Sequence, residues 1–320
     1  MIKKNIIGVF ATLCLGVACN ASAASYPDKP VKIVVPFGAG SSTDILTRAV
    51  ADGLSKKLNN TFIVDNKTGA GGAIGTSSVA SSKPDGYTLL MASNGPMAAN
   101  SSLYSQLNYD PAQDFEPIIL MGKLPMILVA HPDAESDTIE AIISQAKTKP
   151  DSMNFGASNT TARVWVELMK KTADIQPETV LYSNVGALLT DLMGGQIPYA
   201  FENVGPSRPL VESGKLKAVA VTSAERAKFA PDVPTMAESG FPQELVVWFA
   251  LFAPKGTPEA VVNELNQAVN ELLETPELLG IAEQIDMQVA GGSPSDLRDY
   301  QAKEIDNWRN LVELTGVRIN

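Results

Sequence analysis

Residues 31–54 read as a strand, a loop of small residues and the start of a helix. Residues 31–35 are apolar and mostly β-branched, which is typical of a buried strand. Helical spacing of apolar residues begins at position 45 and continues to position 54. The loop between them, PFGAGSSTD, therefore ends at a helix N-terminus. Free backbone N–H groups and a partial positive charge make such an end suitable for a carboxylate, phosphate or sulfate.

A related stretch occurs later in the chain. Residues 37–43 read FGAGSST and residues 155–161 read FGASNTT, and each is followed by a helical pattern. Two such copies predict two similar lobes that present helix N-termini to a shared cleft. A simpler interpretation of the first copy is that Ser42, Thr43 or Asp44 only caps the helix.

The N-terminal segment has the pattern of a cleaved secretory signal. Residues 1–23 carry two lysines, an apolar run over residues 6–18 and then Ala-Ser-Ala. The apolar run is shorter than a comfortable membrane span. Cys19 offers a lipoprotein alternative, but Gly16 stands where a lipid-anchoring signal normally has leucine, so we expect secretion without a lipid anchor.

Charge and cysteine usage limit the partners of the mature chain. Both cysteines lie within residues 1–23, so cleavage leaves no disulfide, no cysteine-based metal site and no thiol nucleophile. Cleavage also removes two of the 25 Lys and Arg and none of the 35 Asp and Glu, which changes the net charge from −10 to 23 − 35 = −12. An acidic chain of this kind argues against nucleic acid and anionic lipid as partners. A small anionic ligand remains compatible, because a few oriented amides act locally.

A glycine-rich loop follows the second predicted strand, at residues 61–65. Its glycines, within residues 69–75, let the backbone approach a ligand closely, and residues 73–80 can begin a helix. The spacing lacks the third glycine of a dinucleotide loop, and Thr76 stands where a P-loop requires lysine. We therefore expect no nucleotide cofactor here.

Catalytic patterns are weak. His131 is the single histidine, no Gly-x-Ser-x-Gly elbow is present, and no metal-ligand spacing occurs. We interpret His131 as structural. A pair of catalytic carboxylates is not excluded, but no pattern indicates one, so the sequence predicts neither an enzyme nor a metal or cofactor site.

The chain resembles the substrate-binding proteins of tripartite tricarboxylate transporters, also called the Bug family. The resemblance is carried by PFGAGSSTD, the GAGGAIG loop, PDGYTLL, NYDPAQDFEPI, LMGGQI, KLKAVAVTSAER, DVPTMAESG and WFALFAPKGTP. These motifs occur in the family's order and spacing over essentially the whole mature chain.

The resemblance implies an α/β fold of the type II periplasmic binding protein class, with two α/β lobes and a ligand cleft between them. Lobe 1 would comprise residues 24–124 and 247–320, and lobe 2 residues 125–246. The implied function is a non-catalytic periplasmic receptor that captures a small organic acid by lobe closure and delivers it to a tripartite tricarboxylate-type permease, with a monomeric receptor as the expected state. Two alternatives stay open: a ligand-sensing receptor that docks on a signalling partner, and a secreted enzyme on a related two-lobed fold.

In the family, the two loops of lobe 1 hold one ligand carboxylate, and lobe 2 contacts the distal half of the ligand. The implied contacts in lobe 1 are Phe37, Gly40, Ser41, Ser42, Thr43, Asp44, Gly69, Ala70, Gly71, Gly72, Ala73, Ser93 and Asn94. Those in lobe 2 are Ser158, Thr160, Thr161, Arg163, Tyr182, Asn184 and Glu202.

Several positions depart from the family pattern, so the ligand is not copied from a relative. Ser41 stands in place of a glycine, and Asn184 replaces the lysine of a Tyr-Lys-Gly sequence. Arg163 replaces a histidine; it can pair with a second carboxylate of the ligand or be an exposed helix residue. Glu202 can accept hydrogen bonds from an amino or hydroxyl group, or pair with Arg208, which we favour because an unpaired carboxylate facing an anion costs affinity. Aliphatic and aromatic acids remain equally open.

Overall fold

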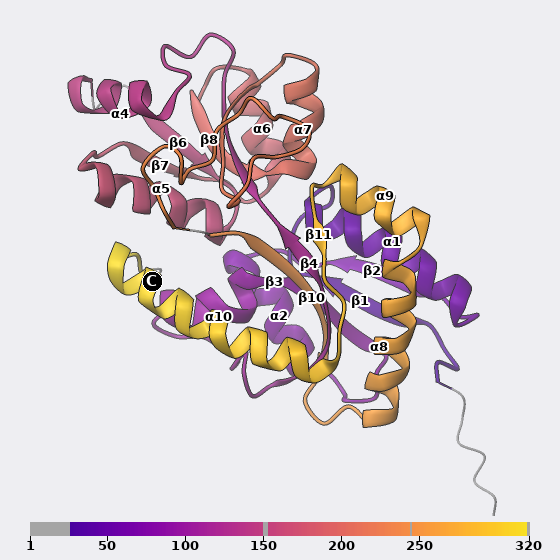
Figure 1. The fold of residues 1–320 in the computed structure, drawn as a ribbon. Coiled ribbons are helices and arrows are strands. Elements are labelled where there is room, and N and C mark those ends of the chain that lie inside the picture. Colours follow the sequence, from indigo (N-terminus) through magenta and orange to yellow (C-terminus); the bar gives the residue numbers. More distant parts are fainter. Residues whose placement is uncertain (1–25, 150–152, 244, 319–320) are drawn as a thin grey trace, which may run out of the picture.

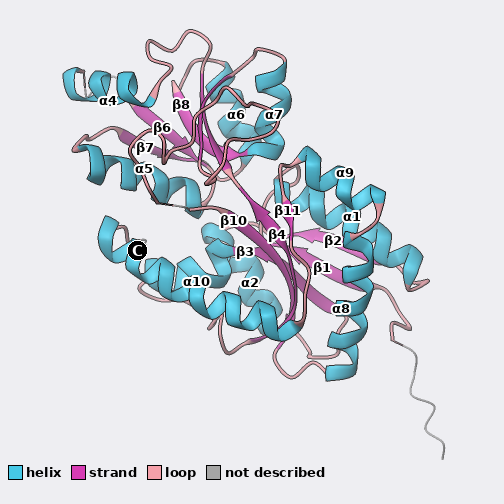
Figure 2. Ribbon diagram, viewed as in Figure 1, coloured by secondary structure: helices cyan, strands magenta, loops and turns pink. Residues whose placement is uncertain are grey.

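A computed structural model describes residues 26–149, 153–243 and 245–318. The predicted signal segment at residues 1–23, with its cysteines, lies outside the described residues. The described chain forms two α/β halves, each built around its own sheet (Figures 1 and 2). The prediction of a two-lobed α/β fold is therefore confirmed.

The first half, here called lobe 1, contains a six-stranded sheet in the order β11-β4-β10-β3-β1-β2. Strands β1, β2 and β3 run parallel, whereas β10 is antiparallel to both β3 and β4. The bounds are β1 Val31–Val35, β2 Phe62–Asn66, β3 Thr88–Ser93, β4 Phe115–Leu124, β10 Val247–Pro254 and β11 Gln288–Val289.

Helices cover both faces of this sheet (Figure 1). One group comprises α1 Ser42–Lys57, α8 Glu259–Leu273 and α9 Pro276–Gln284, which contact one another. The other comprises α2 Ala73–Ala80, α3 Asn100–Leu103, α10 Pro294–Thr315 and two short turns, η1 Ala70–Gly72 and η2 Gly95–Ala99. Because both faces are covered, the inner strands β1, β3, β4 and β10 are buried almost throughout instead of alternating, whereas the edge strand β2 is only partly buried.

The second half, lobe 2, contains a five-stranded sheet in the order β7-β6-β8-β5-β9. Strand β6 is parallel to β7 and β8, and β5 is antiparallel to β8 and β9. The bounds are β5 Met126–Ala130, β6 Asn154–Ala157, β7 Glu178–Leu181, β8 Tyr199–Asn203, β9 Lys217–Val221, α4 Ile139–Thr148, α5 Thr160–Ala173, α6 Val185–Met193 and α7 Val204–Glu212.

The chain passes between the two sheets at two places that lie side by side. Only Pro125 separates β4 from β5, although these strands belong to different sheets. The returning chain enters lobe 1 at Val247, which pairs with Leu124. Proline has no N–H for a strand ladder, so it suits the point where the pairing partner changes. These crossings are consistent with the domain boundaries predicted at 124/125 and 246/247, which we retain as a proposal.

The two FGA stretches begin their helices at the same relative position. The N-cap is Ser41 before α1 and Asn159 before α5, so the expectation that Ser42, Thr43 or Asp44 caps α1 is wrong. The copies differ before that point, since residues 155–157 belong to strand β6 whereas residues 37–40 form a loop after β1. The two stretches are therefore similar in structure only where their helices begin.

Candidate functional site

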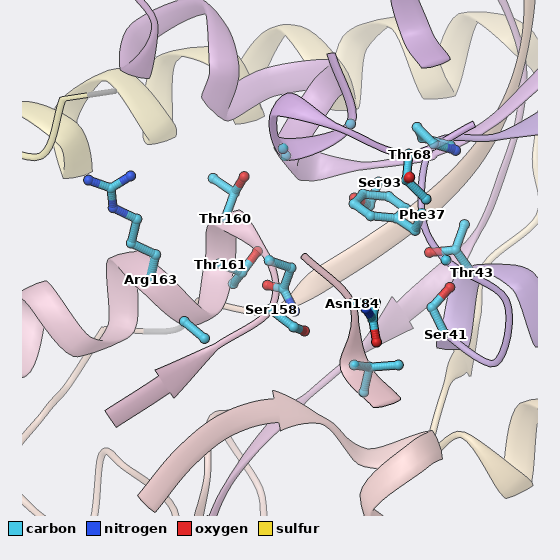
Figure 3. A pocket seen from close by; sticks show the side chains of 18 of the residues that line it. Phe37, Ser41, Thr43, Thr68, Ser93, Ser158, Thr160, Thr161, Arg163 and Asn184 are labelled. Carbon is cyan, nitrogen blue, oxygen red and sulfur yellow. The ribbon is translucent and has the colours of Figure 1, made fainter. Parts of the chain in front are cut away.

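A cavity of about 290 Å³ lies between the two lobes. It is bounded by residues at or just beyond the carboxyl ends of β1, β3, β6, β7 and β8, which is where α/β sheets place ligands. Figure 3 shows Phe37, Ser41 and Thr43 from lobe 1 on one side and Ser158, Thr160 and Thr161 from lobe 2 on the other. The cavity therefore needs both lobes to be complete.

The lobe 1 wall consists of two backbone loops. In the first, Oγ of Ser41 accepts a 3.3 Å hydrogen bond from the N–H of Asp44 and so begins α1 beside the cavity. In the second, residues 69–72 all have positive φ, from 47° at Ala70 to 123° at Gly69. This conformation turns the chain sharply and brings bare backbone to the cavity surface.

Gly71 shows why the second loop needs a residue without a side chain. A Cβ atom placed there would lie 2.9 Å from the hydroxyl of Tyr104 and 3.4 Å from Oγ1 of Thr160. The close approach is to Tyr104 of the same lobe, whereas the distance to Thr160 of lobe 2 is an ordinary van der Waals contact, so a methyl group at this position would disturb the lobe 1 wall.

The lobe 2 wall is made of helix starts. Oδ1 of Asn159 accepts a 3.0 Å hydrogen bond from Ala162 N–H, and Oδ1 of Asn184 accepts a 2.8 Å hydrogen bond from Ala187 N–H. Both caps line the cavity, as does Asn203, which precedes α7. The N-termini of α1, α5, α6 and α7 thus surround one space, and their partial positive charges favour an anion there without any lysine.

One side-chain hydrogen bond crosses the cavity. Nδ2 of Asn94, just after β3, donates to Oγ1 of Thr161 in α5 at 3.1 Å and also to the carbonyl of Val246 at 3.2 Å. This bond joins lobe 1 to lobe 2.

Glu202, at the end of β8, is the buried acid of the cavity wall, with only 2 % of its surface exposed. Oε2 accepts a hydrogen bond from the hydroxyl of Ser158, and Oε1 accepts one of 2.8 Å from the N–H of Asn203. Burial raises the pKa of Glu202 to about 7, although these two hydrogen bonds oppose the shift.

The favoured pairing of Glu202 with Arg208 is wrong. Arg208 forms an ion pair of 2.7 Å with Glu212, one turn further along α7, and donates a 3.0 Å hydrogen bond to the carbonyl of Glu283 in lobe 1. The i,i+4 spacing on one helix gives Arg208 a closer carboxylate than the one in the cavity.

Arg163 lies at the outer end of the cavity, apart from the cluster of Ser158, Thr161 and Asn184 (Figure 3). Its Nη2 donates a 3.2 Å hydrogen bond to the carbonyl of Arg318 beyond α10. The Arg163 side chain is therefore partly buried and already has a hydrogen-bond partner, and its pairing with a second ligand carboxylate stays a prediction.

Tyr182 is another of the predicted lobe 2 contacts. Its hydroxyl group donates a hydrogen bond of 2.9 Å to Oδ2 of Asp191.

Sixteen of the twenty predicted contacts line the cavity. These are Phe37, Ser41, Thr43, Gly69, Ala70, Gly71, Gly72, Ser93, Asn94, Ser158, Thr160, Thr161, Arg163, Tyr182, Asn184 and Glu202. The structure does not place Gly40, Ser42, Asp44 or Ala73 on the cavity wall.

Asp44 shows the physical reason for one of these corrections. Its Oδ2 accepts hydrogen bonds from the N–H of Gly40 at 2.9 Å and from Nε of Arg48 at 3.0 Å, and its Oδ1 accepts one from Asn66 at 2.9 Å. Burial alone would raise the pKa of Asp44, but these donors lower it. The carboxylate therefore holds the first loop in shape and points away from the ligand space. Ser42 is likewise fully buried, within lobe 1 at the start of α1.

The sequence did not identify every wall residue. The additional ones are Pro36, Gly38, Thr68, Gly95, Tyr104, Ala157, Asn159, Leu181, Ser183, Val185, Asn203, Val247 and Phe249. Asn159 and Asn203 could have been predicted from the sequence, because each immediately precedes a helical pattern and asparagine is a preferred N-cap. Phe249 could not, because a buried aromatic in a central strand looks like any core residue.

Metal and membrane features are absent from the part of the chain that the structure describes. No group of three or more His, Cys, Asp or Glu in it could hold a metal ion, and none of its helices combines the length and apolar character needed to span a bilayer. Nδ1 of His131 accepts a 3.1 Å hydrogen bond from Asp133 N–H in a turn that does not line the cavity. This contact agrees with a structural role for His131.

Two α/β lobes joined by two adjacent crossings, with a cavity of helix N-termini between them, define a periplasmic binding protein. The structure of the periplasmic binding protein BugD superimposes with a TM-score of 0.87 at 32% identity, covering 92% of this chain and 99% of that one. The structure titled "R. palustris Rpa4515 with adipate" gives a TM-score of 0.88 at 33% identity, covering 92% and 99%.

The model of the tripartite tricarboxylate transporter family receptor matches residues 46–317. Protein BugT of Bordetella pertussis (strain Tohama I) is 34% identical over 98% of this chain and 97% of its own length. The chain therefore belongs to the tripartite tricarboxylate transporter family of receptors, as its motifs predicted.

Proposed function

We propose that the protein is a periplasmic receptor that captures a small organic acid in the cavity between its lobes. This proposal rests on one observation: the N-termini of α1, α5, α6 and α7 meet around one cavity, and no lysine lines that cavity. Such ends bind a carboxylate with N–H groups whose direction the helices already determine. The adipate bound by the related protein from R. palustris is a ligand of this class and supports the proposal.

In this proposal, one ligand carboxylate lies on the lobe 1 loops, at residues 37–43 and 69–72. The distal half meets lobe 2 at Ser158, Thr160, Thr161 and their neighbours. The ligand contacts both walls only when the lobes are together, so its binding energy favours the closed form. The receptor then delivers the ligand to a membrane permease of the tripartite tricarboxylate type.

The receptor acts without catalysis and as a monomer. Members of its family are binding proteins, and the cavity brings no histidine or cysteine to the ligand. We further propose that the N-terminal 23 residues direct export and are then removed, with no lipid attached at Cys19.

A ligand screen on the refolded, ligand-stripped mature protein tests this function. Thermal unfolding is followed with mono-, di- and tricarboxylates, amino acids and aromatic acids. A ligand at 100 times its Kd adds about 2.7 kcal/mol to the free energy of unfolding, which is a clear shift of the midpoint. The matching amides, alcohols and sugars serve as neutral controls. A shift with acids but not with these controls supports the receptor, whereas a shift only with the neutral solutes, or with nothing in the screen, contradicts it. Release of altered product from a bound acid would contradict the non-catalytic part alone.

A further inference from the structure

The inner wall of the cavity carries hydrogen-bond acceptors that have spare capacity. Oδ1 of Asn94 and Oδ1 of Asn203 are both buried without a hydrogen-bond partner, and the two residues are 1 % and 8 % exposed. Both residues line the cavity beside Glu202, whose two carboxylate oxygens each accept a single hydrogen bond. A carboxylate has about four acceptor positions, so Glu202 can accept more.

The orientation of the Asn94 amide is determined by its neighbours. Nδ2 faces the carbonyl oxygen of Val246 at 3.2 Å, and that oxygen can only accept. Reversing the amide would place two oxygens against each other, so Oδ1 must be the atom that stays unpaired. This oxygen has almost no accessible surface, so Glu202 is the acceptor that remains for a ligand.

Among the residues that the structure describes, no cation is placed to pair with Glu202. The adjacent strands β5 and β6 carry no charged residue. On the helices packed against β8, the charged groups are engaged elsewhere or exposed: Arg163 with the Arg318 carbonyl, Lys170 with Glu167, Arg208 with Glu212, Asp191 with Tyr182, and Lys171 at the surface. The pKa of Glu202 is raised by burial and by no neighbouring charge.

We propose that the ligand is a carboxylate whose distal end carries a hydrogen-bond donor, an ammonium or hydroxyl group, and that Glu202 accepts from this donor. This inference rests on the proposed function and names the class of acid within it. It makes Glu202 the residue that discriminates between such acids and dicarboxylates.

The two classes of ligand place opposite demands on Glu202. A distal ammonium or hydroxyl group donates to the carboxylate in its charged form. A second ligand carboxylate would face that charge, so it binds well only when Glu202 has taken up a proton. Binding of a dicarboxylate is therefore linked to proton uptake above pH 7, and binding of an amino acid is not.

Isothermal titration calorimetry with length-matched acids tests this assignment. For each chain of two to six carbons, the set comprises the dicarboxylate, the ω-amino acid and the ω-hydroxy acid, from oxalate, glycine and glycolate up to adipate, 6-aminohexanoate and 6-hydroxyhexanoate. The proteins are the wild type, Glu202→Gln and Glu167→Gln. Glu167 is the matched control, because it is a lobe 2 carboxylate that also accepts from a hydroxyl, that of Thr179, but lies outside the cavity wall.

At pH 8 the wild type should bind the amino or hydroxy member of the best length at least about tenfold more tightly than the matching dicarboxylate. Glu202→Gln should reduce that ratio by about tenfold or more, while Glu167→Gln should leave it unchanged. Titrations in buffers of different ionisation enthalpy should show proton uptake only with the dicarboxylate. The comparison of amino with hydroxy acid then identifies the donor.

Two results would overturn the inference. If dicarboxylates bind best at pH 8 and Glu202→Gln does not change the ratio, this assignment fails while the receptor function stands. If no acid of any kind binds the folded wild type, the proposed function fails and this inference fails with it.

Discussion

The side chains of Asn94 and Thr161 meet across the cavity in a 3.1 Å hydrogen bond that joins lobe 1 to lobe 2. Asn94 follows a strand of the first sheet, and Thr161 lies in the first turn of a helix that packs on the second sheet. The bond joins the lobes in the arrangement that this structure shows, and we predict that it is lost when the lobes open.

Removing the Thr161 hydroxyl should weaken ligand binding more than it weakens the fold. In Thr161→Val the closed form loses one hydrogen bond, worth about 0.5–1.5 kcal/mol, so Kd should rise about two- to tenfold. Asn94 keeps its bond to the carbonyl of Val246. Calorimetry measures the effect, and Thr148→Val on α4 is the control, since that hydroxyl bonds only within its own helix. Equal Kd values for Thr161→Val and the wild type would contradict the role in closure.

The N-cap of α5 should matter for both stability and binding. Asn159→Ala removes the acceptor of the Ala162 N–H and should cost about 1 kcal/mol of unfolding free energy in urea titrations. It should also lower ligand affinity, because that helix start forms the lobe 2 wall. Thr138→Ala removes the matching cap of α4, outside the cavity wall, and should cost similar stability without changing Kd. Loss of affinity in both variants would mean that general destabilisation is responsible.

Gly71 should tolerate no side chain when the lobes are closed. Gly71→Ala combines a left-handed φ of 58° with a Cβ only 2.9 Å from the Tyr104 hydroxyl. Gly214→Ala shares the left-handed backbone, with φ of 70°, but its Cβ meets nothing within 4 Å. Both should lose about 1 kcal/mol of unfolding free energy, and only Gly71→Ala should bind ligand more weakly. Calorimetry measures the ligand affinity, and equal Kd values for Gly71→Ala and Gly214→Ala would refute the steric argument.

The pKa of Glu202 predicts how stability depends on pH. The folded pKa of about 7 lies above the unfolded value, so the folded protein binds the extra proton between those two values. The contribution of Glu202 to unfolding free energy therefore falls as pH rises from about 4.3 to 7 and is constant above that range. Relative to Glu202→Gln, the wild type should lose about 3 kcal/mol between pH 4.5 and 8 in urea titrations. Parallel pH curves for the two proteins would show that the carboxyl titrates normally.

Local pattern identified most of the elements of the site. Residues 31–35 form the predicted strand, and the loop that follows does end at a helix start beside the cavity. The exact cap was missed, since Ser41, Ser42 and Thr43 are all good caps by residue type. The conformation of the preceding loop determines at which of these residues the helix begins, and therefore which side chain accepts the hydrogen bond. Asp44 holds that loop through its hydrogen bonds with Gly40 and Asn66.

The sequence by itself determined the glycine loops and the helix starts, because these follow from short-range periodicity, capping chemistry and backbone freedom, and the resemblance of its motifs to a known family implied the two-lobed α/β class. Only the tertiary structure decided which polar groups face the ligand. In that structure Asp44 holds a loop in shape, Arg208 pairs with Glu212, and Glu202 lies in the cavity wall with acceptor positions free. The reason is that burial and pairing depend on residues far apart in the chain, such as Asn94 and Thr161, that meet only when both sheets are assembled.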